Sequence, residues 1–276
     1  MNQKEVKNLL KKYNIYPSRR LGQNFLVNEG VLKKIIKAAN LSKEDVVLEV
    51  GPGIGNLTLE LAKRVKKVIA VEKDRRMCQI LKELLEGWNI GNVEIVNKDI
   101  LKLEPKTYNL KPKTYKVVAN IPYYLTSPLI RKFLEAKYPP KEMILMVQKE
   151  VAQRICAKPP DMSILAVSVQ FYAEPKIISF VSKKSFWPSP KVDSATLRIT
   201  QIHTDRKTDT HRFFKVVRAG FSQPRKQLAN NLSNGLKMDK EKVKNWILKN
   251  NIQPSQRAET LNTEDWIKLI KSCKIR

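Results

Sequence analysis

The residue types needed to make an aromatic amine react occur in the run Asn120-Ile121-Pro122-Tyr123. Such an amine is a poor nucleophile because its lone pair is delocalised into the ring. The side-chain oxygen of Asn120 and the carbonyl oxygen of Ile121 can accept hydrogen bonds from the amine and favour a more tetrahedral nitrogen. Pro122 stiffens the turn, and Tyr123 offers a ring face on which a base can stack. The run therefore predicts chemistry on an extruded base, which unpaired RNA permits at low cost; the alternative is a tight turn with two packed tyrosines.

A second candidate site is the glycine-rich turn Gly51-Pro52-Gly53-Ile54-Gly55-Asn56, between a predicted strand and a predicted helix. Glycines let the backbone approach a ligand closely, and the helix N-terminus that follows offers free N–H groups. Glu72 ends the next predicted strand, 21 positions after Gly51, where a Rossmann-like fold places the carboxylate that binds ribose hydroxyls. A dinucleotide fingerprint needs a third glycine where Asn56 stands. The G-x-G-x-G pattern instead resembles the first motif of class I methyltransferases, in which the loop meets the amino-acid end of S-adenosylmethionine.

Asp99 ends a third predicted strand, and its carboxylate is a candidate acceptor for the adenine amine of that cofactor; a helix-capping aspartate is the alternative. Apolar, β-branched runs predict strands buried on both faces at 45–50, 67–72, 93–99, 115–120 and 143–148. Helical patterns, such as those at 57–65 and 74–86, alternate with them. This alternation predicts a parallel, doubly wound α/β sheet, and the runs 164–172 and 192–199 are expected to extend it as an antiparallel edge.

The pattern changes near residue 201, where the polar stretch 201–210 predicts a linker. Helical patterns follow at 211–221, 226–233, 239–249 and 263–272, with no strand-like run among them. We therefore expect two domains. Residues 1–204 would form the catalytic domain, and residues 205–276 a small all-helical domain.

Charge is the most informative feature of the composition. The 276 residues include 53 Lys and Arg against 26 Asp and Glu, a formal net charge of +27. A Lys-rich genome can produce such an excess, but it favours a polyanionic partner, with nucleic acid ahead of an anionic membrane surface. We expect no membrane span and no secretory signal, and therefore a cytoplasmic protein. Cys78, Cys156 and Cys273 are expected to be reduced thiols, and His203 and His211 do not form a zinc pattern, so no metal is expected.

Three motifs together carry a resemblance to a known family. They are Gly22-Gln23-Asn24-Phe25-Leu26, the run at 120–123, and the segment 186–195, which reads FWPSPKVDSA. The chain resembles the rRNA adenine dimethyltransferases, which include the KsgA/RsmA enzymes of the small subunit and the Erm resistance enzymes of the large subunit. The resemblance extends from about residue 18 to the C-terminus. It implies a Rossmann-like class I methyltransferase that uses S-adenosylmethionine. The expected reaction is N6,N6-dimethylation of two adjacent adenines near the 3′ end of small-subunit rRNA during ribosome biogenesis, by a monomer.

The resemblance also implies a role for individual residues. Asn24 and Leu26 would close over S-adenosylmethionine, and Gly51 and Gly53 would contact it through the backbone. Glu72 would hold the ribose and Asp99 the adenine of the cofactor. Asn120 would touch both cofactor and target amine, with Ile121 and Pro122 completing the motif, while Tyr123 and Phe186 would sandwich the flipped base. Gln23 and Phe25 are left out of the site, because packing residues that fix the loop account for them equally well.

Two features favour the small-subunit group over the Erm group. Erm sequences typically carry a serine after the first glycine of the loop, where this chain has Pro52. The segment 257–261 with Trp266, and the segment 221–228, resemble the C-terminal motifs of the small-subunit enzymes, although Pro224 departs from the expected basic residue. The alternatives are an Erm-type enzyme, a non-catalytic nucleic-acid-binding relative and, last, a NAD-dependent oxidoreductase. On a helix, Arg212, Lys215 and Arg218 would form a stripe that reads phosphates, or a solvated face.

Overall fold

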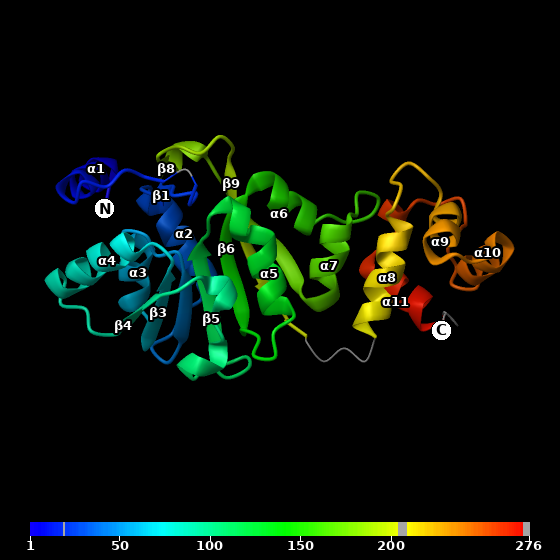
Figure 1. Cartoon of the computed structure of the whole chain (residues 1–276), viewed down its shortest axis with the longest axis horizontal. Helices are drawn as coiled ribbons and strands as arrows, with labels where there is room; N and C mark the ends of the chain where they lie inside the picture. Colours follow the sequence, from blue (N-terminus) through cyan, green and yellow to red (C-terminus); the bar gives the residue numbers. More distant parts are fainter. Residues whose placement is uncertain (19, 204–208, 273–276) are drawn as a thin grey trace. The chain divides into compact units, whose positions relative to one another are not determined.

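The computed structural model describes residues 1–18, 20–203 and 209–272. The chain divides into two compact units (Figure 1). The first unit comprises residues 1–152 and 174–204, and the second unit comprises residues 153–173 and 205–276. The predicted division at 204/205 falls outside the described residues, as does Cys273, and the domain assignment stays a prediction. Residues 153–173 group with the C-terminal helices, which the sequence did not suggest.

A seven-stranded sheet forms the centre of the first unit, in the order β4-β3-β2-β5-β6-β9-β7. Its strands are β2 (Val46–Val50), β3 (Lys67–Glu72), β4 (Val93–Asn97), β5 (Tyr115–Asn120), β6 (Glu142–Gln148), β7 (Glu174–Val181) and β9 (Ser194–Thr200). Strands β2 to β6 pair in parallel, and β9 pairs antiparallel with both β6 and β7. The five predicted parallel strands and the antiparallel run at 192–199 are confirmed.

Helices pack around this sheet because its strands are apolar on both faces (Figure 1). They are α2 (Glu29–Ala39), α3 (Asn56–Ala62), α4 (Arg75–Gly87) and α5 (Thr126–Leu134), and α6 (Lys149–Ile155) crosses the boundary of the two units. Asn28 and Asp74 cap α2 and α4 through their side chains, which satisfies N–H groups that a helix start leaves free. The predicted α/β alternation is therefore confirmed.

A short helix and a two-stranded ribbon lie beside the glycine-rich turn. Helix α1 (Gln3–Lys12) begins with a capping box between Asn2 and Glu5. Its buried Val6 and Leu10 belong to a core cluster that also contains Phe25 and Ile54. Strand β1 (Phe25–Leu26) pairs antiparallel with β8 (Phe186–Trp187), so the first and third motifs of the sequence lie side by side.

One predicted strand is wrong. Residues 164–172 form a helix, α7 (Ile164–Tyr172), and the edge strand of the sheet is β7, which the sequence did not indicate. The run is apolar on nearly every side, and a short buried helix then shows the same pattern as a buried strand. Ser163 decides the start of the helix, because its hydroxyl accepts a hydrogen bond from Ala166 N at 3.2 Å.

The described part of the second unit contains helices and no strand, which confirms the predicted helical C-terminal region. Besides α7 it has α8 (Thr210–Gly220), α9 (Leu228–Leu236), α10 (Lys240–Leu248) and α11 (Thr263–Lys271). Phe171 stacks on Phe213 with ring centroids 4.0 Å apart. Trp266 is fully buried against Gly220, where a Cβ would lie 2.3 Å from the indole ring. The Phe171–Phe213 contact joins residues 153–173 to this core.

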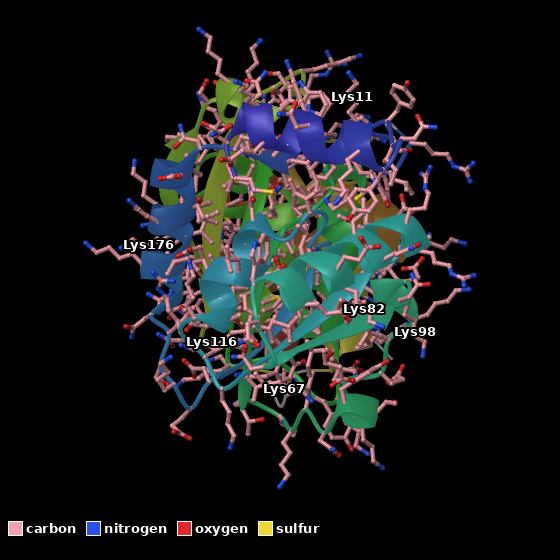
Figure 2. The ribbon with its side chains drawn as sticks, turned by 90° about the vertical axis from the view of Figure 1, so that its left-hand side faces the viewer. Lys11, Lys67, Lys82, Lys98, Lys116 and Lys176 are labelled. Atoms are coloured by element: carbon pink, nitrogen blue, oxygen red, sulfur yellow. The ribbon has the colours of Figure 1, made fainter. Side chains whose placement is uncertain are left out.

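Most lysines of the first unit end in solvent, but Lys116 is only 4% exposed (Figure 2). Its Nζ lies 3.1 Å from Asp45 Oδ2 and 3.2 Å from Glu142 Oε1. It also donates to the carbonyl oxygens of Ala39 and Asn40. Lys116 is the second residue of β5, at the end of the strand away from Asn120. This buried ionic cluster therefore ties strand starts together and is separate from the predicted site.

Candidate active site

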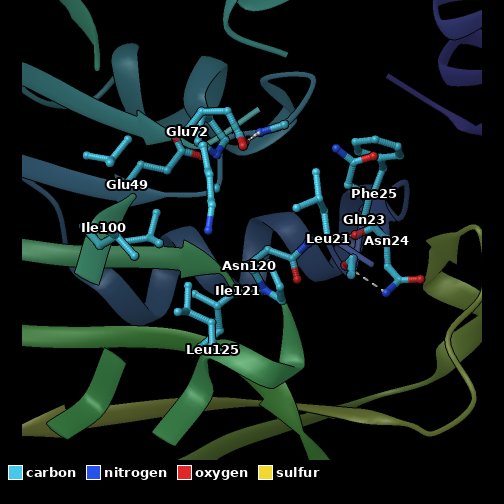
Figure 3. A pocket seen from close by; sticks show the side chains of 18 of the residues that line it. Leu21, Gln23, Asn24, Phe25, Glu49, Glu72, Ile100, Asn120, Ile121 and Leu125 are labelled. Atoms are coloured by element: carbon cyan, nitrogen blue, oxygen red, sulfur yellow. Dashed lines mark hydrogen bonds between the residues drawn. The ribbon is translucent and has the colours of Figure 1, made fainter. Parts of the chain in front are cut away.

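A cavity of about 220 Å³ lies at the carboxyl ends of β2, β3 and β5 (Figure 3). The chain leaves β2 toward β3 on one side and reaches β5 on the other, so this is the switch point where open α/β sheets bind ligands. All of the predicted site residues line it. They are Asn24, Leu26, Gly51, Gly53, Glu72, Asp99, Asn120, Ile121, Pro122, Tyr123 and Phe186. The fold brings them together, while their individual roles stay predictions.

The glycine-rich turn has the close-fitting backbone that a ligand cradle needs. Gly51 has φ +67° and donates its N–H to Val71 O at 2.9 Å. Gly53 has φ +55°, and a Cβ there would lie 3.1 Å from the Phe25 ring. Asn56 donates from Nδ2 to Leu26 O at 2.8 Å and so ties β1 to the turn. A side chain at Gly53 would press on Phe25 of the segment 22–26, here called the closing segment. A side chain at Gly51 would meet only an ordinary contact with Pro122, but its positive φ favours glycine.

Glu72 is positioned as a fixed acceptor. Its Oε2 accepts from Gly53 N at 3.3 Å, and its Oε1 accepts from Asp74 N at 2.9 Å (Figure 3). Burial raises the pKa of this carboxyl above its usual value, and the backbone amides act in the opposite direction. The remaining lone pairs face a cavity that can take a ribose, so the residue fits the nucleoside part of S-adenosylmethionine.

Asp99 performs the capping role that the sequence left open as an alternative. Its Oδ1 accepts from Leu101 N at 3.0 Å at the start of the 3₁₀ turn η1 (Ile100–Lys102). Its Oδ2 lies 2.8 Å from Lys73 Nζ, and this hydrogen bond lowers the pKa of the carboxyl. Asp99 also lines the cavity, so capping and a contact to the adenine of the cofactor are compatible.

The side-chain amide of Asn120 is held by the closing segment. Its Nδ2 donates to Asn24 O at 3.1 Å, so the donor end of the amide is used (Figure 3). The acceptor Oδ1 is at the opposite end of the amide, in the lining of the cavity. This arrangement suits a group that accepts a hydrogen bond from an amine N–H, the role predicted from the sequence.

The two predicted stacking residues differ in accessibility. Tyr123 is half-buried, and its hydroxyl lies 2.8 Å from Ser194 Oγ, which holds the ring in place. Phe186 is only 4% exposed, so little of its ring is accessible to a base. Ser194 was not singled out in the sequence, although it lies within the third motif. Its position opposite the run at 120–123 depends on β9, which only the folded sheet places there.

Glu49 is a cavity residue that the sequence analysis missed. It is 1% exposed, and its Oε2 has no hydrogen-bond partner among the described residues. Burial, with a smaller contribution from the charge of Glu72, raises its pKa to about 8. Thr58 lies close enough to favour the ionised form, but its hydroxyl is not in hydrogen-bonding geometry. The available signal was an acid inside an apolar strand directly before the glycine-rich turn.

Replacing Glu49 with glutamine is expected to change how stability depends on pH. A carboxyl whose pKa is raised on folding destabilises the folded state increasingly between its ordinary pKa near 4.5 and its folded pKa of about 8. The wild-type melting temperature, relative to that of Glu49→Gln, should therefore fall across this range and level off above it. Thermal melts from pH 5 to 9 measure the difference, with the exposed Glu86→Gln as control. Parallel curves for wild type and Glu49→Gln would show that Glu49 does not titrate this way.

The described residues contain neither a membrane-spanning helix nor a metal-binding cluster. No helix there is both long and apolar enough to cross a membrane. Within the same ranges, no three His, Cys, Asp or Glu side chains are grouped so that they could hold a metal ion.

Comparison with known proteins gives the family. The sequence model described as ribosomal RNA adenine dimethylase matches residues 17–274. The chain belongs to this family. A ribosomal RNA small subunit methyltransferase A from Dehalococcoides mccartyi is 44% identical, over 96% of this chain and 91% of that protein. One from Alkaliphilus oremlandii is 41% identical, over 95% and 94%. Solved structures of related proteins are also similar to this member of the ribosomal RNA adenine dimethylase family.

Two of these have the same fold. A dimethyladenosine transferase from Plasmodium falciparum is 31% identical, with a TM-score of 0.74 over 88% of this chain and 94% of that one. The 23S rRNA methyltransferase ErmE is 28% identical, with a TM-score of 0.74 over 90% and 99%. The predicted Rossmann-like class I methyltransferase fold with C-terminal helices is confirmed. The protein is thus in a family of S-adenosylmethionine-dependent methyltransferases.

Proposed function

We propose that this protein transfers methyl groups from S-adenosylmethionine to the N6 amine of adenines in small-subunit rRNA and forms N6,N6-dimethyladenosine. The observation that carries the proposal is the Asn120 amide, whose donor end binds Asn24 O and whose acceptor end is left for an amine in the same cavity as Glu72. Relatives named for the small subunit are 41–44% identical, whereas ErmE is 28% identical, which favours the small subunit over the Erm alternative.

The cavity fits the methyl donor by its chemistry. S-adenosylmethionine supplies an electrophilic methyl group on a sulfonium. The backbone of Gly51 and Gly53 would lie against its amino-acid end, and Glu72 would accept from the ribose hydroxyls. Asp99 would accept from its adenine, and the β1 segment with Asn24 and Leu26 would cover it.

The residues of the catalytic run act on the amine. Asn120 Oδ1 and the Ile121 carbonyl oxygen accept hydrogen bonds from its two N–H groups, which directs the nitrogen lone pair away from the ring. Tyr123 supports the base, and its hydroxyl bond to Ser194 keeps the ring from turning. The nitrogen forms a bond to the methyl group as the S–CH3 bond breaks, S-adenosylhomocysteine leaves, and the methylated, cationic nitrogen releases one proton to water. The monomethylated amine keeps one N–H and still fits one acceptor, so this chemistry allows a second transfer.

The test is nucleoside mass spectrometry of undermethylated small ribosomal subunits after incubation with the protein and S-adenosylmethionine. N6,N6-dimethyladenosine is expected, with two methyl donors consumed per adenine. Large-subunit rRNA is the parallel substrate, and its exclusive modification would favour an Erm-type enzyme. Monomethyladenosine alone at exhaustive reaction would contradict the dimethylation. RNA binding without any methyl transfer would favour the non-catalytic relative.

We propose that the second unit selects the RNA. The basic stripe predicted on α8, Arg212, Lys215 and Arg218, needs one correction. Lys215 and Arg218 on α8 are exposed, as are Arg225 and Lys226 in the loop that follows. Arg212 does not share that exposure, because its Nε and Nη2 are buried without a hydrogen-bond partner among the described residues. The guanidinium lies inward because its helix position borders the buried side of α8 beside Phe213 and Val216. Four exposed cations remain as candidates for phosphate contacts.

Replacing Lys215 or Arg218 with glutamine is expected to weaken rRNA binding and to make the affinity less dependent on salt concentration. Each phosphate contact releases counterions, so each substitution should flatten the log–log slope of affinity against salt by about one. Filter binding from about 50 to 200 mM salt measures the slope, with the exposed Lys82→Gln as a matched control. A slope equal to the wild-type slope in both variants would identify these side chains as a solvated face.

A further inference from the structure

Tyr124 differs from its neighbour Tyr123 although the two share one turn. Both belong to the 3₁₀ turn η3 (Tyr123–Leu125). Tyr123 is half-buried and bound to Ser194, whereas Tyr124 is 56% exposed at the rim of the cavity. No hydrogen bond to its hydroxyl is found within the described ranges. The second tyrosine of the catalytic turn thus presents an open ring beside the predicted base site.

The backbone fixes where this ring stands. Leu125 N donates to Pro122 O at 2.9 Å and closes the turn that carries both tyrosines. Gly22, with φ +63°, lies against the same turn, and a Cβ there would be 3.0 Å from Pro122 Cβ and 3.7 Å from Tyr124 Cδ1. One edge of the ring is therefore supported by the closing segment, while more than half of the residue remains accessible.

Cationic side chains surround the same rim. Lys73 and Lys98 line the cavity, and Lys98 projects at the surface (Figure 2). The pKa of Lys73 is raised, chiefly by its hydrogen bond to Asp99. The exposed Arg20 directly precedes Leu21 and Gly22, which line the cavity. Lys73 is paired with Asp99, but Lys98 and Arg20 have no ion-pair partner in the described part of the chain. An exposed ring flanked by unpaired cations matches the surface that binds a single-stranded nucleotide.

We propose that Tyr124 is the stacking surface for the unpaired nucleotide next to the target adenine, with Lys98 and Arg20 beside its phosphates. The inference rests on the proposed function. If Tyr123 supports the extruded base, the adjoining nucleotide leaves the cavity at its rim, and the next side chain of the turn is Tyr124. Stacking of this kind holds the strand at the cavity mouth without selecting a sequence, because every base has a face.

Binding of short RNA tests the role directly. The probes are a single-stranded oligoribonucleotide with one central adenosine and the same strand with abasic residues on both sides of it. Loss of one stacked base typically lowers affinity about 5- to 150-fold, so Tyr124→Ala should bind the intact strand that much more weakly than wild type. Tyr124→Phe keeps the ring and should bind like wild type. On the abasic strand, wild type and Tyr124→Ala should bind alike. Tyr108→Ala, on the 3₁₀ turn η2 (Pro105–Tyr108) outside the cavity lining, is the tyrosine control.

Three results would overturn the inference about Tyr124, and a fourth would refute the proposed function. Equal affinity of wild type and Tyr124→Ala for the intact strand would overturn the inference, and so would the same loss on the abasic strand. A loss of S-adenosylmethionine affinity in Tyr124→Ala, measured by calorimetry, would also overturn it by assigning the ring to the cofactor site. Absence of methyl transfer by the wild-type protein on small subunits would refute the proposed function instead, since the RNA-binding comparison does not depend on catalysis.

Discussion

Replacing Asn120 with alanine is expected to lower kcat for methyl transfer by about 10²- to 10³-fold, the usual effect of removing one preorganised hydrogen-bonding group from a reacting centre. The group is preorganised here because Asn120 Nδ2 is bound to Asn24 O at 3.1 Å, which aims Oδ1 before any ligand arrives. Alanine removes both the acceptor and the bond to the closing segment. Single-turnover methylation of small subunits at saturating S-adenosylmethionine measures the effect without contributions from product release.

Two further variants separate the chemical role from a structural one. Asn120→Asp keeps an acceptor but loses the donor to Asn24, so its kcat should fall less than that of alanine. Tyr123→Ala should lose methyl transfer and retain S-adenosylmethionine binding, because its ring is assigned to the base. Asn120→Ala should lose methyl transfer and some affinity for S-adenosylmethionine, because Asn120 is assigned to both the base and the cofactor. A Tyr123→Ala enzyme that methylates rRNA at the wild-type rate would contradict the stacking role.

Glu72→Ala is expected to weaken S-adenosylmethionine binding by roughly one to two decades. Loss of a charged acceptor for buried hydroxyls costs about 1.5–3 kcal/mol. The backbone amides of Gly53 and Asp74 hold the Glu72 carboxylate in place before the ligand binds. The alanine variant therefore loses an acceptor that is already positioned for the ribose hydroxyls. Isothermal titration calorimetry gives the affinity, and circular dichroism checks that the variant is folded.

Glu72→Gln and a pH series sharpen this test. Glutamine keeps the size and one acceptor oxygen, so its loss of affinity should be smaller than that of alanine. Because burial raises the pKa of Glu72, the ionised acceptor is lost on acidification earlier than for an exposed glutamate, and wild-type affinity should fall as the pH drops toward that pKa. The alanine variant should lack this dependence. Unchanged affinity in a folded Glu72→Ala protein would remove Glu72 from the cofactor site.

The strand-end residues of the candidate site were predictable because they follow local patterns, whereas Asn24, Leu26 and Phe186 were predicted only from the family resemblance. Glu72 and Asn120 end their strands, Asp99 follows closely after β4, and Gly51 comes directly after β2. Since parallel strands in an α/β sheet end at the same edge, strand-ending residues meet there whatever the details of packing. The apolar runs that identify these strands are a property of the local sequence. Motif residues and the main fold therefore needed no tertiary information.

Burial, hydrogen-bond partners and the conformation of one apolar run, in contrast, were decided only by the tertiary structure. The apolar run 164–172 became α7 because aromatic partners such as Phe213 pack against it, and a buried helix and a buried strand have similar sequences. Glu49 and Arg212 look like ordinary charged residues in the sequence, yet the fold buries their polar atoms. Tyr123 and Tyr124 are identical neighbours, and one is tied to Ser194 while the other is open to solvent. Burial and hydrogen bonding depend on segments distant in the chain, so residue type and spacing determined which groups reach the site, and packing determined their accessibility and charge state.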